Sequence, residues 1–159
     1  MNAYTRFLFM ILTSTALMLG LMYLNTYALT HVYWSETRFY MALYMGAMMA
    51  IVMLAFMLGN YANKKANVSI FLASAVIFVA ALMLVRSQAT VQDVAWMKAM
   101  IPHHSIAILT SERAQISDPR VRKLADEIIQ AQRLEIDEMQ ALITDLQGGE
   151  KATPEIDGK

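Results

Sequence analysis

A stretch rich in methionine and histidine, residues 97–104, contains the side chains of this chain that are best suited to metal chemistry. It holds two thioethers and two adjacent imidazoles, in a chain that has no cysteine and one further histidine. Thioether and imidazole groups are the ligands that soft and borderline metal ions such as copper prefer. The candidate ligands in this stretch are Met97, Met100, His103 and His104.

Helical spacing limits which of these side chains can share one ion. Met100 and His104 are four residues apart, so they lie on neighbouring turns of one helix face and could chelate an ion together. Met97 and His104 are about 10.5 Å apart along the helix axis, so they share an ion only if Pro102 distorts the helix. His103 and His104 point about 100° apart, so we expect one to ligate while the other faces a carboxylate or a partner chain.

The elements that position this stretch are two predicted helices. The first is expected to begin near Val91, after a capping box of Thr90 and Asp93, and to kink or restart at Pro102. It ends at about Gln115. The second begins with Asp118 as N-cap and Pro119 in the first helical position, and ends before a pair of glycines at residues 148–149.

One face of the second helix is expected to form the other wall of the metal site. On this face Met139 supplies a third thioether, and Glu135 is the natural partner of an imidazole, whose tautomer it would fix. Polar groups at core positions need such partners. The predicted inward stripe consists of Leu124, Ile128, Gln132, Glu135, Met139, Leu142 and Leu146.

Two amphipathic helices cannot enclose a core by themselves. Stacking two hairpins into a four-helix bundle would bury both apolar stripes. We therefore expect a homodimer or a higher even homo-oligomer, with residues 97–104 facing the shared interior.

The first half of the chain has the composition of a membrane protein. Three apolar runs, Phe7–Leu29, Phe39–Asn60 and Val68–Val85, are each long enough to cross a ~30 Å hydrocarbon core as a helix. The first run lacks the small-residue cleavage site of a signal peptide. We predict an all-α protein with three transmembrane helices in residues 1–86, an exported helical hairpin in residues 87–147 and a disordered tail in residues 148–159.

The cations of the first half predict its orientation. Arg6 precedes the first run, and Lys64 and Lys65 separate the second from the third. The positive-inside rule puts these residues and the N-terminus in the cytoplasm, so the hairpin emerges on the outer face of a bacterial inner membrane. The charges balance to zero and no basic run occurs, which argues against a nucleic-acid partner.

The second apolar run carries a methionine at every fourth position from Met41 to Met57, beside a stripe of small residues. Small residues let membrane helices approach closely. The methionines have two interpretations. They are flexible apolar filler, or they are a ladder of thioethers that passes a soft cation across the membrane.

Segments of the second half resemble domain-of-unknown-function family 305, over about residues 91–146. They are Met100–Ile108 with its Met-Ile-Pro-His-His core, the pairs Asp118-Pro119 and Leu124-Ala125, and Ile128–Met139 with its Gln-x-x-Glu-Ile-x-x-Met pattern. The resemblance implies a ferritin-like helical fold, an exported location and, in some members, copper or silver binding in bacterial metal resistance. By the same resemblance, the expected ligands are Met97, Met100, His103, His104 and Met139, supported by Gln132 and Glu135.

Together these patterns predict a membrane-anchored protein, not an enzyme, that binds copper for sequestration, resistance or handover to a copper-handling partner. Cu(I) is the expected ion, with Cu(II) or Ag(I) as alternatives. The Glu-x-x-His repeats of di-iron bundles and the His-Glu-x-x-His motif are both absent from the sequence. Two alternatives stay open: a structural or oligomerisation module, and transport of soft ions, although no ionisable group within the spans marks a path.

Overall fold

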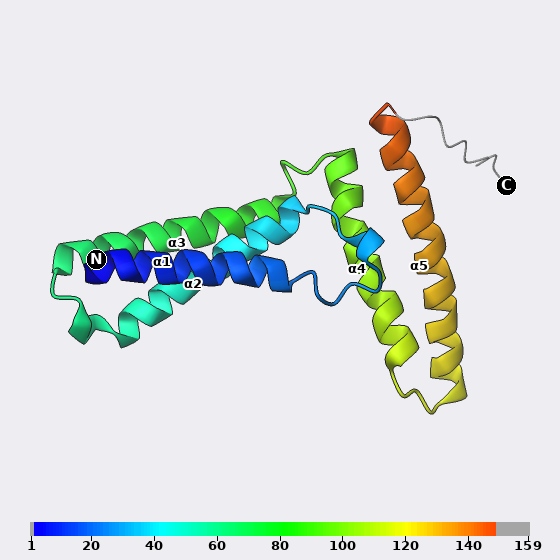
Figure 1. Ribbon diagram of the computed structural model, residues 1–159, viewed down its shortest axis with the longest axis horizontal. Coiled ribbons are helices and arrows are strands. Elements are labelled where there is room, and N and C mark those ends of the chain that lie inside the picture. The colour runs from blue at the N-terminus through cyan, green and yellow to red at the C-terminus, as the bar shows by residue number, and fades with distance from the viewer. Residues whose placement is uncertain (1, 149–159) are drawn as a thin grey trace. The chain divides into compact units, whose positions relative to one another are not determined.

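The structure, a computed structural model, describes residues 2–148, and all of its regular elements are helices (Figure 1). This confirms the predicted all-α class, while residues 149–159 of the predicted tail lie outside the described part. Two compact units are present: a three-helix unit, Met1–Met22 with Glu36–Val91, and a hairpin unit, Tyr23–Ser35 with Gln92–Lys159. The α-helices are α1 (Ala3–Leu21), α2 (Glu36–Phe56), α3 (Lys64–Ser87), α4 (Asp93–Arg113) and α5 (Pro119–Leu146), and the 3-10 helices are η1 (Leu29–His31) and η2 (Leu58–Asn60).

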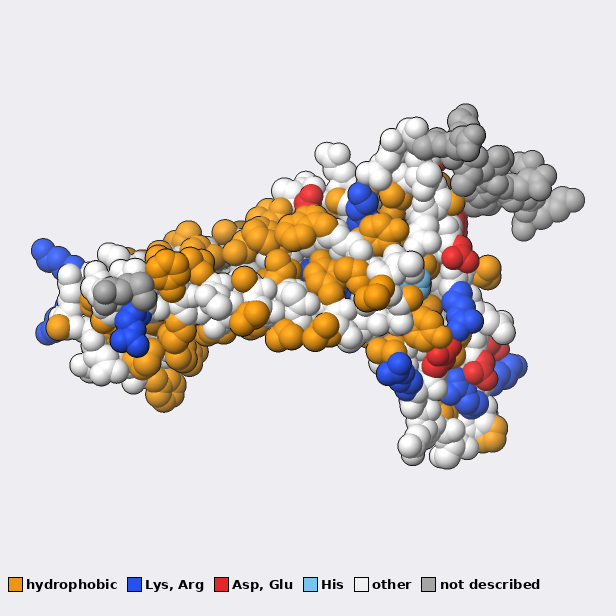
Figure 2. All heavy atoms as spheres, viewed as in Figure 1, with side chains coloured by type: hydrophobic (Ala, Val, Ile, Leu, Met, Phe, Trp, Pro, Cys, Tyr) orange, Lys and Arg blue, Asp and Glu red, His pale blue; other side chains and the backbone are white. Residues whose placement is uncertain are grey.

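The three-helix unit consists of the helices that are long and apolar enough to cross a membrane. At 1.5 Å per residue, α1, α2 and α3 are about 28, 32 and 36 Å long, close to the ~30 Å of a hydrocarbon core. Figure 2 shows hydrophobic side chains along the length of this unit and charged side chains of both signs over the hairpin unit. The prediction of three apolar helices of membrane-spanning length is confirmed.

The first apolar run does not form one helix up to Leu29, as its hydropathy predicts. Helix α1 ends at Leu21, and a turn follows in which the Thr26 hydroxyl donates to the Tyr23 carbonyl oxygen at 2.9 Å. Residues 23–35 then belong to the hairpin unit, so the compact units are not the contiguous segments 1–86 and 87–147. An apolar run records that side chains leave water, but it does not say whether lipid or protein covers them.

A polar clasp closes one end of the three-helix unit. The Tyr4 hydroxyl lies 2.9 Å from Asn67 Oδ1 and accepts from the Asn63 N–H at 3.0 Å, and Asn67 donates to the Tyr61 carbonyl oxygen at 2.9 Å. Asn63 is also the N-cap of α3, where it accepts from the backbone N–H of Ala66. The backbone of Asn63 and the side chain of Asn67, at the beginning of α3, therefore also hold the start of α1 against it.

Helix α2 packs against both α1 and α3 through small residues. Ala42, Gly46 and Ala50 are buried on α2, as the predicted small-residue stripe requires. A Cβ atom added to Gly46 would overlap the side chain of Thr15 on α1, so only glycine allows this approach. The methionine ladder is half-buried: its members Met49, Met53 and Met57 pack against the apolar core of the unit, as filler does.

The contact between Gly46 and Thr15 can be tested by adding one methyl group. Gly46→Ala should destabilise the three-helix unit by about 1–3 kcal/mol, because the added carbon overpacks the helix interface. Gly20→Ala is the matched control: nothing lies within 4 Å of its added Cβ, and alanine has the higher helix propensity. Thermal unfolding in detergent, followed by circular dichroism, measures both variants. Equal unfolding midpoints would contradict the packing.

The hairpin unit pairs α4 with α5 around one apolar cluster. Helix α4 runs through Pro102 without restarting, and it begins at Asp93 with Gln92 as N-cap, so the predicted capping box at Thr90 is wrong. Thr90 instead has its hydroxyl 3.0 Å from that of Tyr40. The predicted cap of α5 is confirmed, because Asp118 accepts from the Arg120 N–H at 2.8 Å.

The inward face of α5 coincides with the predicted stripe at Met139, but its other buried residues each lie one position after a predicted one. Leu124 and Leu146 are each 56% exposed, whereas the buried positions follow the neighbouring stripe. Several apolar residues of α5 occur as adjacent pairs, so periodicity alone supports either phase, and packing against α4 selects one. The buried residues of α5 are Ala125, Ile136, Met139 and Ile143.

Candidate metal site

His104 is held between the two helices of the hairpin unit through both of its ring nitrogens. Nδ1 lies 3.1 Å from the Met100 carbonyl oxygen, one turn earlier on α4, and Nε2 lies 2.7 Å from Glu135 Oε2 on α5. Gln132 Nε2 donates to the same carboxylate oxygen at 3.2 Å. The carbonyl and carboxylate oxygens both accept, so each contact calls for a hydrogen on its ring nitrogen, and Nε2 could ligate an ion only after it has lost that hydrogen and parted from Glu135. The predicted pairing of Glu135 with an imidazole is present.

His103 and Met100 border this pair in different surroundings. His103 is exposed, with its ring centroid 6.3 Å from that of His104. Met100 is half-buried and packs against the apolar cluster of the hairpin. One imidazole is thus open to water, the second is anchored, and a thioether lies one turn away from the anchored ring.

Met97 and Met139 lie inside the apolar cluster, with 5% and 6% of their surfaces exposed. They pack with Ile101, Ile136 and Ile143, which a methionine in a helical core does without any ligand. The structure therefore assembles the predicted residues in two groups. The thioethers of Met97 and Met139 are in the core, and His104 with Glu135 and Gln132 is at its edge.

Among residues 2–148, no group of three or more His, Cys, Asp or Glu side chains is placed to hold a metal ion. A site at His103 and His104 would combine imidazole and thioether donors, so it would differ from a site built only from His, Cys, Asp and Glu side chains.

A second polar cluster, which the sequence analysis missed, surrounds Ser105. This serine is completely buried, and its Oγ accepts from the Tyr27 N–H at 2.7 Å and lies 3.0 Å from His31 Nδ1. Because the hydroxyl already accepts from Tyr27, it can donate its own hydrogen to a neutral His31 ring. Residues 23–35 are thereby fastened to the middle of α4.

Charged side chains surround the contact between residues 23–35 and α4. The Tyr27 hydroxyl donates to Glu112 Oε1 at 3.2 Å, and Arg133 donates to the same oxygen at 2.6 Å with its guanidinium 5.9 Å from the Tyr27 ring centre. His31, Arg133 and Asp137 line a cavity of about 250 Å³ together with apolar side chains. Burial lowers the pKa of His31, and the negative charge of Asp137 partly offsets that shift.

The sequence carried a faint signal of this cluster. Asn25, Thr26, Thr30 and His31 place four polar side chains around the last turn of the first apolar run, which is unlike the interior of a spanning helix. The partner of His31, Ser105, follows the two histidines directly in the sequence, and only the folded hairpin brings His31 to it.

Comparison with known proteins places the second half of the chain in a family. The family described as a domain of unknown function (DUF305) matches residues 83–156. An uncharacterized protein of Acanthamoeba polyphaga mimivirus is 35% identical over 107 residues, which are 66% of this chain and 68% of the viral protein. No solved structure matches. The chain belongs to the DUF305 family.

The contact between the buried Ser105 and the half-buried His31 predicts a pH dependence of the hairpin unit. The pKa of folded His31 lies below the ordinary 6.5, so the unfolded chain binds more protons when the pH falls through that value. Stability is therefore full well above pH 6.5 and declines as the pH falls below that value. His31→Gln should flatten this decline, measured as chemical unfolding at several pH values, whereas His103→Gln, on the exposed side of α4, should retain it. A wild-type pH profile in His31→Gln would contradict the role of His31.

Proposed function

We propose that this protein is a membrane-anchored metal-binding protein that binds a metal ion at the edge of its hairpin unit. The preferred ion is Cu(I), with Ag(I) or Cu(II) as alternatives. The protein's role would be sequestration, resistance or handover rather than catalysis. The three apolar helices anchor it in the plasma (inner) membrane of a bacterium. Arg6, Lys64 and Lys65 favour a cytoplasmic N-terminus and an exported hairpin.

The observation that carries the metal proposal is the placement of His104. Its Nδ1 is oriented by the Met100 carbonyl oxygen, which leaves Nε2 as the ligating atom and sets the ring beside the exposed His103. A ring oriented through a hydrogen bond at one nitrogen, with the other nitrogen available to the ion, is what metal-ligating histidines in proteins have. To ligate, Nε2 has to part from Glu135, and the half-exposed carboxylate is free to turn toward the ion or toward water.

The thioethers favour Cu(I) over harder ions. Met100 is the thioether nearest in sequence to His104 on the same face, and it borders the cluster that contains Met97 and Met139. An ion held by His103, His104 and Met100 would draw on these two buried methionines only if the core rearranges. The donors therefore differ in accessibility: two imidazoles and one thioether lie at the edge of the hairpin, and two thioethers are buried in its core.

The same geometry supports a second candidate, a structural module that needs no metal. His104 satisfies both ring nitrogens within the hairpin, and Met97 and Met139 fill its core. In that case the histidines hold α4 and α5 together, and metal affinity would be incidental.

Copper titration separates the two candidates. Replacing both His103 and His104 by alanine should abolish Cu(I) binding in a competition assay with a colorimetric Cu(I) chelator. Met100→Leu, which conserves volume, should weaken Cu(I) binding more than Cu(II) binding, because the thioether prefers the softer ion. His31→Gln and Met83→Leu, which change the same residue types elsewhere, serve as controls. An unchanged titration in the double variant would refute the metal site.

We propose, in addition, that two hairpin units pair. Leu124 and Leu146 are each 56% exposed on α5, and the half-buried Ile128 and Leu142 lie on the same stripe. Glu135 falls on this stripe as well, so an apolar face flanks the side chains proposed to hold the ion. A second copy is the occupant that a ferritin-like four-helix bundle would supply, and it would cover the metal site from the open side.

The proposed pairing of two hairpin units can be tested by measuring the mass of the protein in solution. The intact chain in mild detergent should behave as a dimer or a higher even oligomer in light scattering coupled to size exclusion. Leu124→Glu should shift it to the monomer, since a charge on an apolar interface loses its hydration. Gln130→Glu, an equally exposed position on another face of α5, should leave the mass unchanged. A monomeric wild type would rule out the pairing.

A further inference from the structure

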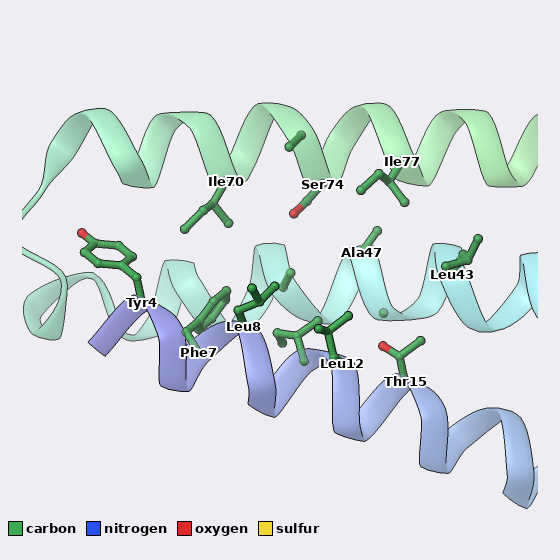
Figure 3. Close-up of a pocket in the computed structure, with 14 residues that line it drawn as sticks. Tyr4, Phe7, Leu8, Leu12, Thr15, Leu43, Ala47, Ile70, Ser74 and Ile77 are labelled. Atoms are coloured by element: carbon green, nitrogen blue, oxygen red, sulfur yellow. The ribbon is translucent and has the colours of Figure 1, made fainter. Parts of the chain in front are cut away.

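An apolar groove runs along the three-helix unit where α1 and α3 flank α2 (Figure 3). Its volume is about 420 Å³, within the range of small-molecule sites in proteins. Tyr4 and Phe7 lie near one end, and Thr15, Leu43 and Ile77 lie near the other. The floor and walls carry small side chains that keep the slot open, namely Gly46, Ala47, Ala50, Ala73 and Ser74.

The length of the groove matches one leaflet of a bilayer. Along α1 it extends from Tyr4 to Thr15, which is about 16 Å of helix and half of a ~30 Å hydrocarbon core. A membrane-spanning helix of a partner would need a groove through the whole core, about 10 Å wide. An acyl chain of a single leaflet needs only this half.

The charges at the closed end of the groove select the lipid. The clasp of Tyr4, Asn63 and Asn67 closes that end, and Lys64 and Lys65 follow it directly at the start of α3. Arg6 lies one turn into α1 at the same end. Within the described three-helix unit, the one acidic residue, Glu36, stands at the opposite end of α2. Cations at the membrane surface attract anionic headgroups.

We propose that this groove binds one acyl chain of an anionic phospholipid, from the leaflet that faces Lys64 and Lys65. The headgroup phosphate lies among the three cations, and the chain fills the slot between α1 and α3. The inference rests on the proposed insertion of these helices in a bilayer, and it names a ligand for a unit that otherwise serves as an anchor.

Spin-labelled lipid tests the site in the full-length protein. The protein is reconstituted in phosphatidylcholine vesicles that contain phosphatidylglycerol with a nitroxide on its acyl chain, and electron paramagnetic resonance measures the immobilised component. Ala73→Phe places a ring in the groove and should remove that part of the immobilised signal which belongs to the site. Ala75→Phe, an exposed position on the same helix outside the groove, should retain it.

A second variant tests the charge. Changing both Lys64 and Lys65 to Gln should remove the preference for labelled phosphatidylglycerol over labelled phosphatidylcholine, while an immobilised component remains.

Equal spectra for Ala73→Phe and wild type overturn the site. Loss of dimer cross-linking in Ala73→Phe, without a change in the lipid spectrum, overturns it in favour of a helix from a second copy. Protein that fails to float with the vesicles contradicts membrane insertion itself, whereas floating protein with no immobilised lipid contradicts only the groove.

Discussion

A hairpin of two amphipathic helices leaves part of its core open to water, and the hairpin unit depends on how that opening is covered. In this protein, residues 23–35 cover it: Tyr33 packs on the apolar cluster, and Tyr27 and His31 meet at the buried hydroxyl of Ser105. A buried hydroxyl is costly unless it is paired, and here it is paired on both sides. The connection between the first two long helices is therefore a structural part of the hairpin domain, and its position depends on one serine.

This arrangement explains why neighbouring residues of α4 have such different surroundings. Successive positions on a helix point about 100° apart, so His103 faces water, His104 faces α5, and Ser105 faces the covering segment. The proposed metal site uses His103 and His104, whereas the predicted pH dependence arises at the contact between Ser105 and His31.

The three-helix unit follows a different rule, because the hydrophobic effect gives little reason for apolar helices to associate within lipid. Van der Waals packing at small residues takes the place of the hydrophobic effect, as where Gly46 allows the side chain of Thr15 to approach α2. Hydrogen bonds at the helix ends also fix which helices pair, as in the clasp of Tyr4 with Asn63 and Asn67. Helix α2 contacts both of its neighbours, and the groove lies between α1 and α3. The three-helix unit thus has a specific internal structure and an apolar groove between α1 and α3.

The sequence alone determined the elements whose signals are local. Three long apolar helices, the Asp118 cap and the pairing of Glu135 with a histidine follow from composition, from spacing and from the need of a polar group for a partner. The tertiary structure alone decided where α1 ends, which of two neighbouring stripes of α5 is buried, and that His31 meets Ser105. Local sequence records that a side chain avoids water or needs a hydrogen bond. Which residue meets that need depends on contacts between segments distant in the chain, such as the 74 positions that separate His31 from Ser105.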